Sequence, residues 1–240
     1  MFVDFLWEYK MKHDKLLKRL NINKAQLEQI KTAVAETEKT TTGEIALAAV
    51  YQSDSYAFVE LFAAFCTAFV SFFILLLFSN PIWKLLDRTF WYPAPSQLTA
   101  AIGFAVICIT AAVYLLLNIP AIDRLIIPRK LKERRVYARA LRHFVESGVY
   151  KTADRTGILI FISVLERKIF IIADSGINEK VLQNQWDGIC KIMTNGLRTK
   201  NTAKAFITAT EECGKILQKY FPTKIKNPNE LADGLVILEH

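Results

Sequence analysis

The sequence predicts an α/β fold in which helices cover a small mixed sheet, interrupted by a two-helix transmembrane hairpin. Three observations lead to this prediction. Two long windows in the middle of the chain carry no charged side chain, at 61–78 and 97–122. Three runs of apolar and β-branched residues lie outside them, at 44–52, 157–164 and 168–174. Amphipathic helical patterns alternate with these runs. Hydrophobic residues make up 52% of the chain, above the roughly 45–50% of ordinary soluble domains.

Residues 1–20 place apolar and basic side chains at helical spacing and are expected to form an amphipathic N-terminal helix. Its apolar side would dock on the membrane or on the soluble domain, and the pattern leaves both open. Residues 24–56 are expected to begin an α/β domain, with a helix to Lys39 that Asn21 or Asn23 caps and a strand at 44–52. We interpret Glu44 as an exposed residue at the start of this strand, with a functional role as the alternative. One helix and one strand do not fold alone, so their partner lies elsewhere in the chain.

The uncharged windows are expected to cross a membrane. As a helix, residues 61–78 would span about 27 Å, close to the hydrocarbon thickness of a bilayer. The second span is expected at 97–119, where Asn118 and Pro120 mark its end. The connector 79–96 carries Trp83, Trp91 and Tyr92, which are typical of the membrane interface. Two antiparallel spans would place both large flanking segments on the same side.

The charge pattern predicts which side that is. The net charge of +8 comes largely from the stretch after the second span, where eight basic residues between 124 and 142 face a single acid, Glu133. Basic residues that flank a span are retained in the cytoplasm and are attracted to anionic head groups. We expect a membrane-surface role for Arg129, Lys130, Lys132, Arg134 and Arg135, and both termini in the cytoplasm. The basic cluster lacks interleaved aromatic residues, so no nucleic-acid partner is expected.

Residues 124–222 are expected to complete the α/β domain. A helix at 132–147 precedes a β-hairpin made of 157–164 and 168–174. Asn178 is expected to cap the next helix, which directs Val181, Leu182, Ile189, Ile192 and Met193 inward and ends near Gly196. A further helix is expected at about 202–220. The tail 223–240 offers an edge strand.

Short motifs in this order resemble the TPM domain family. They are Thr42-Gly43-Glu44-Ile45, Thr156-Gly157-Ile158-Leu159-Ile160, Glu166-Arg167-Lys168-Ile169 and Asp174-Ser175-Gly176-Ile177. The resemblance covers about 24–52 and 131–221 and implies a TPM-like α/β domain. It also implies a bacterial membrane-associated protein, and together with the two predicted spans it leads us to expect a multi-pass protein of the bacterial inner membrane.

The resemblance further implies two activities, a weak phosphatase and divalent-cation binding. Asp154, Asp174 and Glu166 flank the hairpin strands and are the candidate ligands for Ca²⁺ or Mg²⁺. Asp154 and Asp174 would approach each other at one end, with Glu166 at the turn. The alternative assigns structural roles: Asp154 pairs with Arg155 or a helix end, Asp174 caps a helix, and Glu166 belongs to a polar turn. The sequence holds no P-loop, GxSxG or HExxH motif.

Two functions therefore remain open. The first is an interaction or scaffold module that helps to maintain or assemble membrane complexes, with other membrane proteins as partners. The second is a membrane-tethered, divalent-cation-dependent, phosphatase-like hydrolase. The four dispersed cysteines suit a reducing compartment.

Overall fold

The computed structural model describes residues 11, 13–117, 119, 122, 126–152, 154–222, 231 and 233–239. The chain divides into two compact units. The first combines Met1–Asp54 with Lys130–His240, and the second is Ser55–Arg129. The α/β domain is therefore built from two separate segments of the chain, as the sequence predicts.

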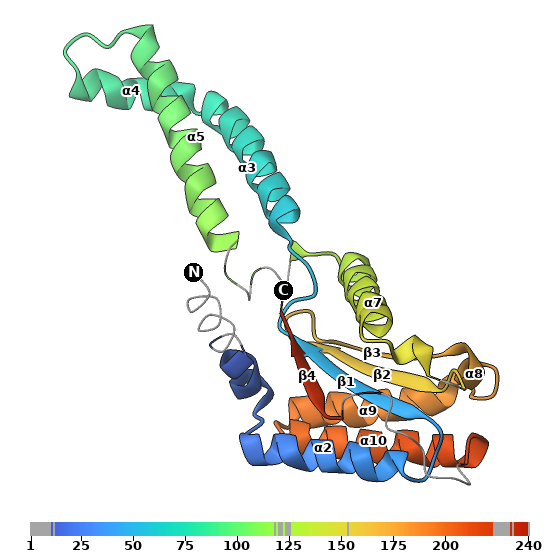
Figure 1. The fold of residues 1–240 in the computed structure, drawn as a ribbon. Helices are drawn as coiled ribbons and strands as arrows, with labels where there is room; N and C mark the ends of the chain where they lie inside the picture. The colour runs from blue at the N-terminus through green and yellow to red at the C-terminus, as the bar shows by residue number, and fades with distance from the viewer. Residues whose placement is uncertain are drawn as a thin grey trace, which may run out of the picture. The chain divides into compact units, whose positions relative to one another are not determined.

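A four-stranded mixed sheet forms the centre of the α/β domain (Figure 1). Its strands are β1 (Glu44–Val50), β2 (Gly157–Ser163), β3 (Lys168–Ala173) and β4 (Leu235–Leu238), in the order β3-β2-β1-β4. β1 pairs in parallel with both β2 and β4, and β2 pairs antiparallel with β3. This confirms the predicted hairpin and the edge strand of the tail. Because β1 and β2 are parallel, a long crossover must join them, and the second unit is inserted into that crossover.

The two Thr-Gly motifs lie at the start of the central strands. Gly157 is paired in register with Glu44, and the Thr156 hydroxyl donates a hydrogen bond to the Thr42 carbonyl at 3.0 Å. A Cβ atom at Gly157 would lie 2.1 Å from the Val149 carbonyl oxygen. Only glycine fits this close approach, which explains why the second motif has glycine at position 157.

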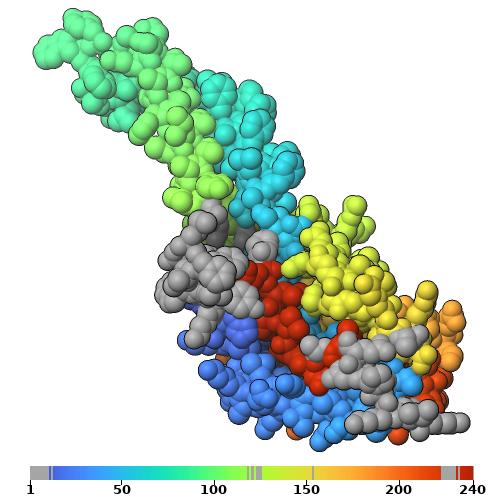
Figure 2. Space-filling view, viewed as in Figure 1, coloured from blue at the N-terminus to red at the C-terminus, as the bar shows by residue number. Residues whose placement is uncertain are grey.

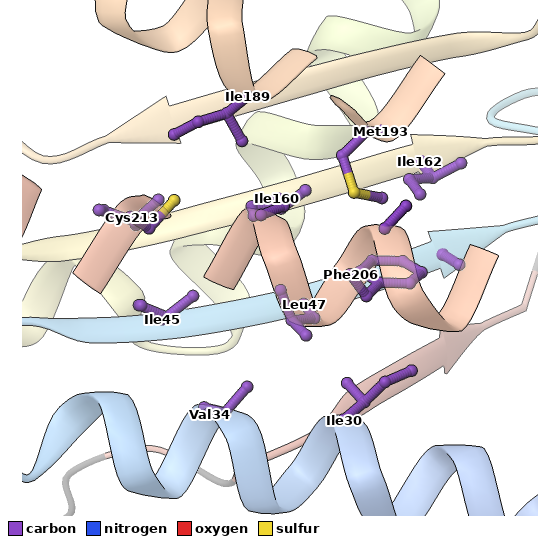
Figure 3. Packing of buried hydrophobic residues seen from close by; sticks show 14 of the residues in the cluster. Ile30, Val34, Ile45, Leu47, Ile160, Ile162, Ile189, Met193, Phe206 and Cys213 are labelled. Carbon is purple, nitrogen blue, oxygen red and sulfur yellow. The ribbon is translucent and has the colours of Figure 1, made fainter. Parts of the chain in front are cut away.

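Helices α2 (Lys24–Glu38), α9 (Gln183–Arg198) and α10 (Thr202–Tyr220) cover one face of the sheet. Figure 3 shows Ile30 and Val34 of α2, Phe206 of α10 and Met193 of α9 packed over the strands. Helix α7 (Arg129–Glu146) covers the other face through Val136, Ala140 and Phe144. Burial of side chains of this size contributes about 1.5–3 kcal/mol each.

The described part of the N-terminal helix docks on this domain. Residues 13–20 are helical, and Leu16, Leu17 and Leu20 are buried in the same cluster as α2 and α10. The sequence leaves open whether this helix docks on the membrane or on the soluble domain. In the structure these three leucines pack on the soluble domain. Residues 1–10 and 12 of the predicted helix lie outside the described residues, as do 223–230 and several others of the tail.

Three local predictions are wrong. Asn178 does not cap the long helix, because it ends the short helix α8 (Ser175–Asn178), whose N-cap is Asp174. Leu182 precedes α9 as its N-cap residue and is 71% exposed, not inward. Glu44 is buried rather than exposed, since β1 is a central strand with neighbours on both sides. Asn23, in contrast, caps α2 with a reciprocal pair of hydrogen bonds to Gln26, as expected.

The second unit consists of α3 (Ala57–Leu77), α4 (Ser79–Thr89) and α5 (Pro95–Leu117). Helices α3 and α5 pack along each other, coloured cyan and green in Figures 1 and 2. Both are long and apolar enough to cross a membrane, and only 11% of each apolar window is buried. Most of the connector 79–96 is helix α4.

Candidate functional site

Asp174 and Asp154 lie at the end of the sheet where β2 begins. Asp174 Oδ1 accepts hydrogen bonds from the Ser175 N–H at 2.6 Å and from the Ser175 hydroxyl at 3.2 Å. Its Oδ2 is buried and has no hydrogen-bond partner. A Cβ atom at Gly176 would lie 2.9 Å from the Asp154 carbonyl oxygen, so the backbones of the two segments meet here. Asp174 also caps helix α8, which agrees with the structural role that the sequence offers as the alternative to metal binding.

This end of the sheet supplies few ligands for a hard cation. Calcium takes six to eight oxygen ligands, and Asp174 offers one free carboxylate oxygen. The cavity beside it, about 510 Å³, is lined by Lys151 and Arg155 as well as Tyr150, Thr152 and Asp174. Among the residues that the structure describes, no three His, Cys, Asp or Glu side chains are grouped closely enough to hold a metal ion. The described donors therefore do not fit a complete cation site.

Glu166 lies at the opposite end of the hairpin, in the turn between β2 and β3, and is buried. Its Oε1 accepts a hydrogen bond from the Ser53 N–H at 2.9 Å, and its Oε2 accepts one from the Ser163 hydroxyl. The structure thus separates Glu166 from Asp174 and uses both of its oxygens within the protein. The carboxylate joins the turn to the loop that follows β1.

The predicted membrane-surface residues all lie on α7, which begins at Arg129. Arg129, Lys130, Arg134 and Arg135 are exposed, and Lys132 is half-buried. In Figure 2 the outer side of α7, in yellow, is exposed on the surface. Arg135 forms an ion pair with Asp54, and Glu133 forms one with Lys168.

A cavity beside α7 was not expected from the sequence. It has a volume of about 340 Å³ and is lined by Ser53, Asp54, Arg135, Ala138, Arg139 and Arg142. Ser53 and the arginines are more than 80 positions apart in the chain, so no local motif indicates that they meet. The only available signal was the basic spacing of Arg135, Arg139 and Arg142 along one helix.

A second buried feature that the sequence did not reveal is a carboxyl cluster around Glu38. Glu38 accepts the Ile45 N–H at 2.7 Å. Burial raises its pKa to about 9, and the neighbouring Glu44 and Asp233 also raise it, whereas the Ile45 hydrogen bond lowers it. Glu38 is therefore a neutral acid at pH 7, which is the form that this apolar position favours.

The histidines and cysteines show no catalytic arrangement among the described residues. His143 is buried in α7, and burial lowers its pKa. Cys213 is fully buried in α10, and burial raises the pKa of its thiol. Cys190 is half-buried, and burial raises its thiol pKa as well. Cys213 therefore behaves as a small apolar core residue, and Cys190 does so in part.

The fold and these features define an α/β domain split by an apolar helical hairpin. Residues 124–216 match the family model of the TPM domain, so the chain contains a TPM domain. The NMR structure of the BA42 protein from the psychrophilic bacterium Bizionia argentinensis is similar, with a TM-score of 0.54 and 18% identity. The similarity covers 90% of this chain and 94% of that chain, and shows a shared fold. No curated protein matches the chain.

Proposed function

We propose that this chain is an integral inner-membrane protein whose TPM domain faces the cytoplasm and serves as an interaction or scaffold module for membrane complexes. The observation that carries the proposal is the surface of α3 and α5. Large apolar side chains remain exposed there, among them Phe58, Phe62, Phe65, Phe69, Phe104 and Ile107. An exposed apolar surface of this extent is stable only in lipid or against another apolar surface.

The distribution of basic residues supports the cytoplasmic orientation. Arg129, Lys130 and Arg134 follow the second apolar helix and are exposed, whereas the connector offers only Lys84 and Arg88 against Asp87. Basic residues near the end of a span hold that end in the cytoplasm. Anionic head groups would be the first partner of these side chains.

An apolar stripe on α7 supports the interaction role. Tyr137, Leu141 and Val145 are four residues apart, so they lie on one side of the helix, and all three are exposed. Leu141 and Val145 are 41% and 51% exposed. A contiguous apolar stripe on a surface helix is a feature of protein-binding faces.

Membrane integration and orientation are tested on the full chain in its host membrane. The protein should stay in the pellet after washing with alkaline carbonate, and a reporter fused after His240 should be active in the cytoplasm. Release into the wash would contradict the anchor. Activity of the reporter only on the far side would contradict the orientation alone.

The interaction role is tested by crosslinking in intact cells, followed by purification in detergent and quantitative mass spectrometry. Leu141→Gln with Val145→Gln should remove a defined set of membrane proteins that the wild-type chain captures. Glu146→Gln, an exposed position on the same helix, is the matched control and should retain them. If the double variant captures the same proteins as the wild-type chain and Glu146→Gln, the apolar stripe of α7 does not recruit them.

The second candidate is the divalent-cation-dependent, phosphatase-like hydrolase. One observation favours it: the free Oδ2 of Asp174 lies beside a cavity whose lining also includes Lys151 and Arg155, which attract phosphate esters. In this case the purified full chain should hydrolyse a generic phosphate ester with Mg²⁺ or Ca²⁺, and Asp174→Asn should abolish turnover. Asp154→Asn tests the second predicted ligand. Equal turnover by the wild-type chain, Asp174→Asn and Asp154→Asn would exclude this site.

A further inference from the structure

The cavity beside α7, here called the arginine cavity, has the lining of an anion site. Its walls are Ser53 and Asp54 from the loop after β1, and Arg135, Ala138, Arg139 and Arg142 from α7. Three arginine side chains therefore line one space of about 340 Å³ within the α/β domain. Guanidinium groups bind phosphate oxygens in pairs of parallel hydrogen bonds, which makes them the preferred phosphate ligands of proteins.

One donor in this cavity is unused. Arg142 forms no ion pair or hydrogen bond with any residue that the structure describes. Its guanidinium group can donate to a bound oxyanion. The Ser53 hydroxyl also has no hydrogen-bond partner, but its oxygen is fully buried, so Ser53 contributes to the wall and not to the donors.

The other two arginines are held in place by the protein. Arg139 donates to the Glu239 carbonyl at 3.0 Å and lies 3.9 Å from Glu146 Oε2, while Arg135 forms the ion pair with Asp54. Glu166 fixes the opposite wall, because it accepts the Ser53 N–H. The walls are thus preorganised, which lowers the entropic cost of binding a ligand.

The charge of the lining indicates the kind of phosphate. Three arginines against one aspartate give the lining a net charge of +2, which the exposed Glu146, 3.9 Å from Arg139, offsets only in part. A phosphomonoester carries about −1.5 to −2 at pH 7, because its second pKa is near 6. A phosphodiester carries a single negative charge and would neutralise only half of the lining. The cavity therefore complements a phosphomonoester.

The order of residues in the chain indicates the source of the phosphate. Only two residues, Ser55 and Tyr56, separate Asp54 from Ala57, the first residue of α3. A wall of the cavity therefore leads directly into the first apolar helix. We infer that the arginine cavity binds the phosphomonoester head group of an anionic lipid such as phosphatidic acid. This inference rests on the proposed membrane anchoring.

The test uses the full chain purified in a neutral detergent, with lipid binding followed by native mass spectrometry. Phosphatidic acid, phosphatidylglycerol and phosphatidylcholine of equal chain length are offered together. The wild-type chain should retain phosphatidic acid in preference to the other two. Arg142→Gln should weaken this binding at least about tenfold, because it removes a charge-assisted hydrogen bond to the phosphate.

Arg198→Gln is the matched control, because Arg198 is an exposed arginine of α9 that does not line the cavity. Its affinity for phosphatidic acid should stay within about twofold of the wild-type value. Equal losses of affinity for Arg198→Gln and Arg142→Gln would show that binding depends only on the overall positive charge of the protein, and would overturn the inference. Glycerol 3-phosphate that binds as tightly as phosphatidic acid would also overturn it, in favour of a soluble phosphomonoester.

The carbonate wash separates this inference from the proposed anchoring. A chain that stays in the washed membrane but shows no preference for phosphatidic acid disproves only the lipid site. A chain that is released by carbonate disproves the anchoring, whatever it binds in detergent.

Discussion

Glu166 Oε1 accepts a hydrogen bond from the Ser53 N–H at 2.9 Å, although 113 positions separate the two residues. The intervening chain contains the whole apolar hairpin and α7. The carboxylate therefore joins the two halves of the split domain at the point where the chain leaves the sheet for α3. The Ser163 hydroxyl, which donates to the other oxygen, orients it.

Removal of this carboxylate is expected to destabilise the domain. Glu166→Ala leaves the buried Ser53 N–H and the Ser163 hydroxyl without partners, at a cost of about 1–3 kcal/mol each. Glu166→Gln keeps an acceptor for Ser53 and an amide donor for Ser163, so its loss should be smaller than that of Glu166→Ala. The melting temperature of the full chain in detergent measures both. Equal melting temperatures for wild type and Glu166→Ala would rule out this role.

Gly157 and Gly188 form a contrasting pair. A Cβ atom at Gly157 would lie 2.1 Å from the Val149 backbone oxygen, whereas at Gly188, inside α9, it would meet nothing within 4 Å. Gly157→Ala should lower stability by several kcal/mol or prevent folding. Gly188→Ala should raise stability by up to about 1 kcal/mol, because alanine is the better helix former. Denaturant unfolding of each variant checks both directions, and tolerance of alanine at Gly157 would contradict the close packing of β2.

Glu38 makes stability depend on pH. Its pKa is about 9 in the folded chain and near 4.5 in the unfolded chain. Below pH 4.5 both states are protonated, so the full stability is present. Between pH 4.5 and 9 unfolding releases the proton, and stability falls by at most about 1.4 kcal/mol per pH unit. Above pH 9 this loss is complete.

Glu38→Gln tests this dependence, because an amide oxygen can still accept the Ile45 N–H but does not titrate. The melting temperature of the variant relative to wild type should rise steadily from pH 5 to pH 9. A difference that stays constant over this range would show that Glu38 does not stay protonated in the folded chain.

The split domain should fold without the hairpin. Asp54 forms an ion pair with Arg135, close to the start of α7, so the two ends left by removing 55–129 lie near each other. A flexible linker of about ten Gly and Ser residues spans roughly 17 Å and should join them. Circular dichroism should show a soluble, cooperatively unfolding α/β protein. Aggregation, or unfolding without cooperativity, would mean that the domain needs the hairpin to fold.

The sequence predicts the elements of this fold better than their ends and contacts. The periodicity of 202–220 gives α10 correctly, and the continuous apolar run at 157–164 gives β2, because both patterns reflect burial directly. The cap of α9 was misplaced because Asp174 and Asn178, four residues apart, have similar capping chemistry, and α8 uses Asp174.

The candidate sites were harder to predict than the helices and strands, because they depend on tertiary contacts. A glutamate in a polar hairpin turn is ordinarily exposed, and Glu166 is buried only because the loop after β1 packs against it. The place of Ser53 in the arginine cavity could not be predicted, because the α7 residues that line the cavity with it come after the inserted hairpin in the chain. The raised pKa of Glu38 likewise arises from burial that no local pattern shows.

Site-resolved alkylation of the cysteines in intact membranes tests the central claim most directly. Cys66 on α3 and Cys108 on α5 are exposed on the protein surface, whereas Cys190 is half-buried and Cys213 is buried in the α/β domain. If α3 and α5 lie in lipid, a water-soluble maleimide should leave Cys66 and Cys108 unmodified in membranes opened on both sides, although it modifies Cys190 slowly. Rapid modification of Cys66 and Cys108 in these membranes would place both helices in water and contradict the account.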